Sequence, residues 1–84
     1  MAHIIAAGNT VVPALLALEA LGFRVEVTAG EHSLCQATRG DESYAAGDPV
    51  TVLGLVRLVE VRGWDWAATD AEIDAVFQRF PLGG

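Results

Sequence analysis

His32 and Cys35 are the two side chains whose types and spacing come closest to a catalytic pair. A cysteine thiolate next to an imidazole can act as a nucleophile, but a cysteine hydrolase also needs a group that orients the base and donors that bind the oxyanion. The separation of three residues would place the two side chains on opposite faces of a hairpin. We therefore expect Cys35 to be a small core hydrophobe, and we predict no catalytic residues.

Neither a metal site nor a cofactor site is predicted. His3, His32 and Cys35 do not have a recognised ligand spacing with a fourth partner. The glycine-containing stretch at residues 8–10 lacks the lysine of a Walker motif and the three glycines of a dinucleotide-binding loop. An anion at the N-terminus of the following helix is an alternative, because free amides and the helix dipole would favour it.

The charge balance favours a basic protein as the partner. The chain has 84 residues, eleven acidic and five basic, with a formal net charge of -6. All five basic residues are arginines and stand singly along the chain, so no basic stripe is present to bind the phosphates of a nucleic acid. A negative field speeds encounter with a basic protein surface, although solubility alone is an alternative reason for the acidity.

Length and composition predict one folded domain over residues 1–84. Hydrophobic residues make up 52% of the chain and charged residues 19%, whereas disordered chains combine low hydrophobicity with high charge. No apolar run approaches the ~18 residues of a membrane span, and the start has no basic region typical of a signal peptide. The single Cys35 agrees with a reducing compartment, so we expect a cytoplasmic protein without membrane contact.

The first half of the chain predicts two strands on either side of a helix, followed by a third strand. Residues 3–7 form a short apolar run typical of a strand, and residues 10–21 form an apolar helix that Gly22 would end. Apolar and polar residues alternate over residues 23–28, which is the clearest strand pattern in the chain. Residues 34–38 would return as its antiparallel partner in a hairpin.

Residues 40–47 have no hydrophobic period and are predicted to form a surface loop. Asp48 and Pro49 then begin a second helix, with Asp48 as the N-cap, and Gly63 ends it. The interior of this segment is rich in β-branched residues, so a strand is the alternative. The apolar residues fit a helical face better than an alternating one, and we therefore predict a helix.

Thr69 and Glu72 predict the start of a third helix, because they have the spacing of a capping box. Its apolar residues recur at helical spacing and should pack on the sheet or on the second helix. These residues are Ile73, Val76, Phe77 and Phe80. Pro81 would stop the helix, which leaves residues 81–84 as a flexible C-terminal tail.

This pattern predicts an α+β fold, a small two-layer sandwich of order β-α-β-β-α-α in which the helices pack on a short sheet. If the first two strands were adjacent and parallel, the first helix would be the right-handed crossover between them.

Two surfaces are candidates for binding another molecule. The helix over residues 10–21 has a single charged residue, so its outer face could meet a second copy of the chain through Val11, Leu15 and Leu18. The acidic stretch and the aromatic turn offer the other surface, because tryptophan and tyrosine anchor interfaces and carboxylates pair with basic side chains. Its predicted residues are Asp41, Glu42, Tyr44, Trp64 and Asp65. Core filling is the alternative role for the tryptophans, with at least one beside Phe77.

Two resemblances to known families follow from these features. The terminal Gly83-Gly84 is similar to the end of ubiquitin and the ubiquitin-like sulfur carriers, but their tail extends from a strand, whereas a capped helix and Pro81 precede it here. In size, acidity and lack of a catalytic set, the chain resembles the immunity proteins that bacteria make against toxins. That resemblance implies an inhibitor that occludes a basic partner.

The leading functional hypothesis is therefore a non-catalytic acidic protein-binding module, such as an immunity-type inhibitor. The alternatives are a homo-oligomeric structural or accessory subunit assembled through the first helix, and a small enzyme whose catalytic set the sequence does not disclose.

Overall fold

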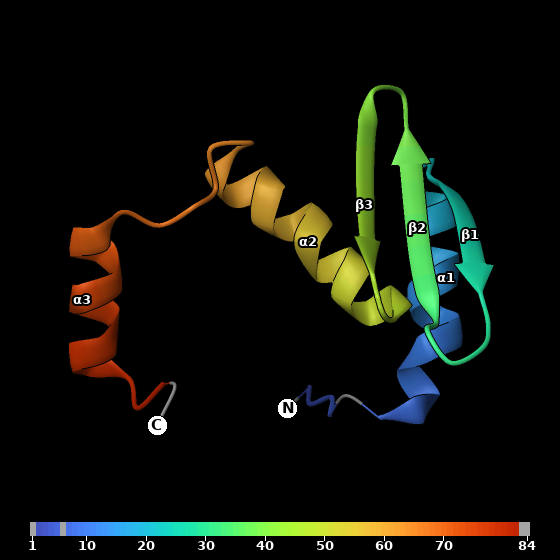
Figure 1. The fold of residues 1–84 in the computed structure, drawn as a ribbon. Helices are drawn as coiled ribbons and strands as arrows, with labels where there is room; N and C mark the ends of the chain where they lie inside the picture. Colours follow the sequence, from blue (N-terminus) through green and yellow to red (C-terminus); the bar gives the residue numbers. More distant parts are fainter. Residues whose placement is uncertain (1, 6, 83–84) are drawn as a thin grey trace.

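The structure is a computed structural model that describes residues 2–5 and 7–82. A short 3-10 helix precedes three helices and three strands (Figure 1). The elements are η1 (Gly8–Thr10), α1 (Val11–Ala20), β1 (Arg24–Thr28), β2 (Leu34–Arg39), β3 (Glu42–Ala46), α2 (Pro49–Arg62) and α3 (Asp70–Arg79).

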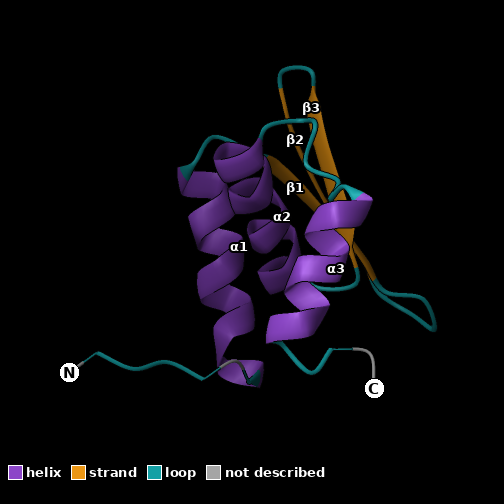
Figure 2. Ribbon diagram, turned by 90° about the vertical axis from the view of Figure 1, so that its left-hand side faces the viewer, coloured by secondary structure: helices purple, strands orange, loops and turns teal. Residues whose placement is uncertain are grey.

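The α+β fold class and the two-layer arrangement are confirmed. The three strands form one antiparallel sheet of order β1-β2-β3. Helices α1 and α2 lie on the same side of this sheet (Figure 2). The core fills the space between the two layers. Its buried residues come from α1, α2, β2 and β3, and from the residue directly before β1. They are Leu18, Phe23, Cys35, Ala37, Tyr44, Val52 and Val56.

The predicted strand over residues 3–7 is wrong. Its described residues have no regular structure, and residue 6 lies outside the described part of the chain. Ile4 and Ile5 are exposed, and the described residues of this run pair with none of the three strands. A single unpaired strand is not stable by itself. The order is therefore α-β-β-β-α-α, and the right-handed crossover between parallel strands does not occur among the described residues.

Residues 40–47 are not a surface loop, because most of them form β3. Glu42 faces Arg39 and Tyr44 faces Ala37 in the pairing of β3 with β2. The strands are joined by a two-residue turn in which Gly40 has a φ of 60°, a conformation that favours glycine. The small residues of β3 hide its alternation: Tyr44 is the one large apolar side chain that points to the core.

The second helix begins and ends where the sequence predicts. Asp48 is the N-cap: its Oδ1 accepts a hydrogen bond of 2.9 Å from the Thr51 amide. Pro49 occupies the first turn, where its missing amide hydrogen costs nothing. Gly63 ends the helix with a φ of 80°, which is unfavourable for other residues. Val52 and Val56, one turn apart, pack the helix onto the sheet.

Helix α3 has its predicted capping box but not its predicted packing. The Thr69 hydroxyl accepts a bond from the Glu72 amide, and the Glu72 carboxylate accepts one from the Thr69 amide. However, none of its residues is buried, and Figure 1 shows α3 set apart from the sheet and from α2. The predicted tail begins with residues 81–82, which have no regular structure, whereas residues 83–84 lie outside the described part.

The contrast between the two faces of α1 predicts how leucine substitutions affect stability. Leu18 is 0% exposed and Leu16 is 59% exposed. Leu18→Ala should lower the free energy of unfolding by about 3 kcal/mol, because it leaves a cavity in the core. Leu16→Ala, the matched control, should change it by no more than about 0.5 kcal/mol in urea denaturation. Equal losses would contradict the orientation of α1.

The capping box predicts a local effect in α3. Thr69→Ala removes the acceptor of the Glu72 amide, whose N–Oγ1 distance is 3.2 Å, and should cost the helix about 1 kcal/mol. Amide hydrogen exchange over residues 72–76 should become faster in the variant, while the exchange of β2 amides serves as the internal control. Unchanged exchange in α3 would show that the helix begins at another residue.

Candidate protein-binding site

Arg39 connects the end of α1 to β3. Its Nη1 donates to the Leu21 carbonyl at 2.7 Å, and its Nε and Nη2 donate to the two oxygens of Glu42 at 3.0 and 3.4 Å. The guanidinium also lies 4.2 Å from the centre of the Phe23 ring. One planar side chain therefore holds three segments together, which lysine could not do because it lacks the forked donor geometry.

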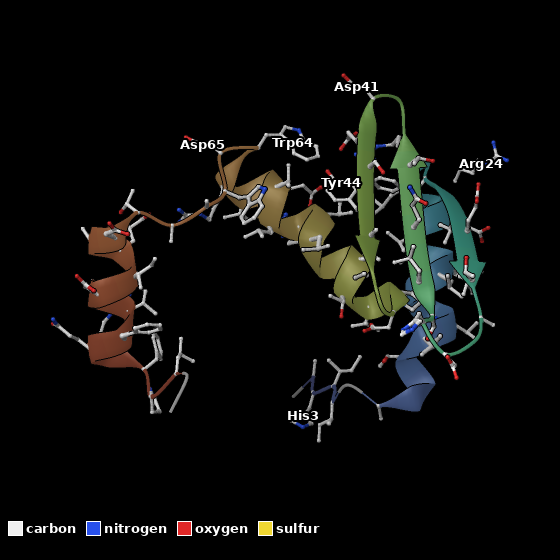
Figure 3. All side chains as sticks on the ribbon, in the orientation of Figure 1. His3, Arg24, Asp41, Tyr44, Trp64 and Asp65 are labelled. Carbon is white, nitrogen blue, oxygen red and sulfur yellow. The ribbon has the colours of Figure 1, made fainter. Side chains whose placement is uncertain are left out.

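Tyr44 continues this network toward the end of α2. Its hydroxyl donates to Oε1 of Glu42 at 2.9 Å, so the carboxylate is bound by both Arg39 and Tyr44. The Tyr44 ring packs edge-on against Phe23, with centroids 5.7 Å apart, and stacks on Trp64 at 5.5 Å. Figure 3 shows Tyr44 and Trp64 facing one another across the space between β3 and α2. The fold thus places an exposed indole on a buried aromatic support.

A groove of about 260 Å³ lies beside this stack, between β3 and the second half of α2. We call it the Trp64 groove; its lining is mainly apolar. It is lined by Ser43, Tyr44, Ala45, Leu55, Leu58, Val59, Trp64 and Trp66. Tryptophans at the end of a helix and an edge strand of the sheet therefore form one concave surface.

The five predicted partner-binding residues have different roles in the structure. Asp41 is exposed at the tip of the β2–β3 hairpin, and Asp65 is exposed beyond the end of α2 (Figure 3). Trp64 is 59% exposed and remains available for contact. Glu42 is partly buried and bonded to Arg39, and Tyr44 is buried beneath Trp64, so these two support the surface from within.

The tryptophans do not fill the core, so this alternative role is wrong. Trp64 and Trp66 are both exposed, and Phe77 lies on the detached helix α3 with most of its side chain exposed. The sequence does not show that the tryptophans are exposed, because their burial depends on where α3 packs.

The bonds to Glu42 change two pKa values in opposite directions. The hydrogen bond from Arg39, and then that from Tyr44, lower the pKa of the Glu42 carboxyl below its ordinary value of 4.5. Burial, and then the hydrogen bond to Glu42, raise the pKa of the Tyr44 hydroxyl above 10.0. Both shifts favour the same arrangement at neutral pH, in which a carboxylate accepts from a neutral phenol.

The predicted oligomer interface on α1 needs one correction. Leu18 is fully buried in the core and cannot contact a second copy without unfolding. Leu15 is partly buried and packs against the core, and Val11 is exposed at the start of the helix. The sheet covers one stripe of the helix, and Val12 and Leu16 lie on the uncovered face.

Neither Cys35 nor His32 has the surroundings of a catalytic residue. Cys35 is buried, and this burial raises the pKa of its thiol, which disfavours the nucleophilic thiolate. His32 is exposed in the β1–β2 turn. Over residues 2–5 and 7–82, no three His, Cys, Asp or Glu side chains gather as metal ligands. No helix in the same part is long and apolar enough to cross a lipid bilayer.

Sequence reasoning missed Arg39 and Trp66. Arg39 is one of five dispersed arginines, and its role depends on the β2–β3 pairing that was not predicted. A signal did exist, since Arg39 and Glu42 flank the Gly40-Asp41 turn and face each other if that turn closes a hairpin. Trp66 lines the groove because the chain turns at Gly63.

Neither family models, nor curated proteins, nor solved structures gave a match to this chain. Its function is therefore argued from its own geometry.

The lowered pKa of Glu42 predicts a pH dependence of stability. A carboxyl whose pKa is lower in the folded state stabilises the fold above its unfolded pKa, and this contribution is lost as the pH falls through the folded pKa. Glu42→Gln should therefore have a lower free energy of unfolding than the wild type at pH 7. This difference in free energy should become smaller as the pH falls below 4.5. Urea midpoints at both pH values measure this.

Glu31→Gln is the control for the loss of one negative charge, because Glu31 lies exposed in the β1–β2 turn. A Glu42→Gln deficit that is as large at low pH as at neutral pH would contradict the role of the carboxylate.

Proposed function

We propose that this protein is a non-catalytic, acidic protein-binding module that binds a basic partner protein through the Trp64 groove. The single observation that carries the proposal is the exposed Trp64 indole, stacked at 5.5 Å on the buried Tyr44 beside an apolar groove. An inhibitor of the immunity type would use such a surface to occlude the partner's functional site.

The rigidity of the aromatic pair supports binding. Tyr44 is fixed by Glu42 and Phe23, and Trp64 follows the residue that ends α2. Tryptophan supplies a large contact area and has few rotatable bonds, so little side-chain entropy is lost on association. A partner side chain that enters the groove would meet a surface already in its bound form.

The exposed acids support a basic partner. Asp41 and Asp65 flank the region of the Trp64 groove and, in the part of the chain that the structure describes, neither forms an ion pair. Such carboxylates are available to arginine or lysine of another protein. The net charge of -6 would speed encounter with a basic surface, and this effect should weaken with salt.

A homo-oligomeric subunit is the second candidate. The observation that favours it is the uncovered apolar face of α3, which is a different surface from the Trp64 groove.

Four immobilised baits test the first proposal in a lysate of the source organism. They are the wild type, Trp64→Ala, Asp41→Lys/Asp65→Lys and the matched control Glu19→Lys/Glu31→Lys, which changes the net charge equally at exposed acids outside the groove. We expect a basic protein to be retained by the wild type and the control. Its retention should fall by about tenfold or more on the two site variants, because each loses an anchor or its steering charges.

Retention by the wild type alone would not test the proposal, so the retention of the same protein is compared over the four baits. Equal retention on all four, or equal loss on the control and the charge-reversed bait, would contradict the proposal.

A further inference from the structure

Helix α3 has an apolar face that is largely exposed in the part of the chain that the structure describes. Ile73, Val76, Phe77 and Phe80 lie at spacings of three and four residues, which places them on one side of the helix. Phe77 is 57% exposed and Phe80 50%. An amphipathic helix of this kind gains most of its stability from packing that face, so a partner surface is required.

Arg62 connects the end of α2 to the segment that leads into α3. Its Nε donates to the Trp66 carbonyl at 2.8 Å, and its Nη2 donates to Glu72 Oε1 at 3.1 Å. Glu72 also accepts the amide of the capping residue Thr69. The last turn of α2, the linker and the first turn of α3 are therefore bonded to one another.

A second groove lies between α1 and α2. Its volume is about 530 Å³, and its lining is mainly apolar. Pro13, Ala14 and Ala17 form the α1 side, while Val50 and Leu53 form the α2 side. The small residues of α1 leave room for large side chains of another helix, which is the complement of the phenylalanines on α3.

The exposed surface is too large for a chain that remains single. The protein exposes 6538 Å², whereas a compact monomer of 8.8 kDa exposes about 4,800 Å², an excess of roughly 1,700 Å². The radius of gyration is 15.1 Å, against about 12 Å for a compact chain of this length. Burial of this excess on two copies would give an interface in the range of obligate homodimers, about 2,000–5,000 Å² in total.

We infer that two copies exchange their α3 helices. The apolar face of α3 from each copy packs into the α1–α2 groove of the other, and the two contacts are related by a twofold axis. A second copy fits this observation, because each chain carries both an exposed α3 face and an α1–α2 groove with room for large side chains. Twofold symmetry then covers both α3 faces and both α1–α2 grooves. None of these surfaces is left to bind a third copy.

This inference is independent of the binding function proposed above. The α1–α2 groove and the Trp64 groove have no lining residue in common, so the two contacts use different residues. Salt distinguishes the two contacts as well: binding to a basic partner should weaken with salt, whereas two copies of charge -6 repel each other less as salt is added.

Sedimentation equilibrium of the full chain tests the exchange. At about 100 µM the wild type should have twice the mass of the 8.8 kDa chain. Phe77→Glu on the helix and Ala17→Glu in the groove should each raise the dimer dissociation constant by about 100-fold or more, because each places a charge in the apolar contact. The matched control Leu16→Glu, on the exposed face of α1 next to Ala17, should remain a dimer.

Mixing the two monomeric variants makes the test specific to the exchange. The Ala17→Glu chain retains an intact α3 and the Phe77→Glu chain an intact groove, so the mixture should regain dimers through one of the two contacts. Far-UV circular dichroism verifies that Phe77→Glu stays folded, as expected for a residue outside the core.

Three results would overturn the inference. A wild type with the mass of one chain would mean that α3 closes on its own chain or stays free. Dissociation by Leu16→Glu would place the interface on the outer face of α1. Failure of the mixture to form dimers would indicate that the two α3 helices contact each other instead.

Discussion

The bidentate bond between Arg39 and Glu42 is the interaction on which the arrangement of the Trp64 groove depends. It joins β2 to β3 next to their turn, and the same guanidinium binds the carbonyl of Leu21 at the end of α1. Because Glu42 also accepts the Tyr44 hydroxyl, the position of the Tyr44 ring follows from the position of Arg39. Trp64 stacks on that ring, so a polar cluster at one end of the sheet positions an aromatic residue on another element.

Elements with strong local signals could be predicted from the sequence, and elements that depend on distant contacts could not. The cap Asp48, the capping box at Thr69 and the alternation of β1 act within a few residues. Strand β3 was missed because its small residues carry little alternation and its pairing with β2 defines it. The run at residues 3–7 has the composition of a strand, but its described residues pair with none of the three strands, and the sequence does not contain that information.

The candidate site shows the same limit. Composition draws attention to acids and aromatics and predicts one role for all of them, whereas the fold exposes some of these side chains and buries or bonds the others. Trp64 and Asp41 face solvent, whereas Glu42 and Tyr44 hold the surface in place. The separation of α3 from the sheet was not predicted either, because the apolar face of an amphipathic helix is expected to pack within its own chain. An amphipathic pattern reveals that a helix needs a partner surface, but not which molecule supplies it.

Quenching of Trp64 fluorescence by acrylamide tests most directly whether Arg39 positions this surface. In a Trp66→Phe background, Arg39→Lys should increase the quenching constant of Trp64, because lysine cannot bind Leu21 and both oxygens of Glu42 together. Arg57→Lys is the control, since Arg57 pairs with Glu60 on the surface of α2. An Arg39→Lys protein in which Trp64 is quenched no more than in this control would contradict the dependence of the Trp64 groove on Arg39.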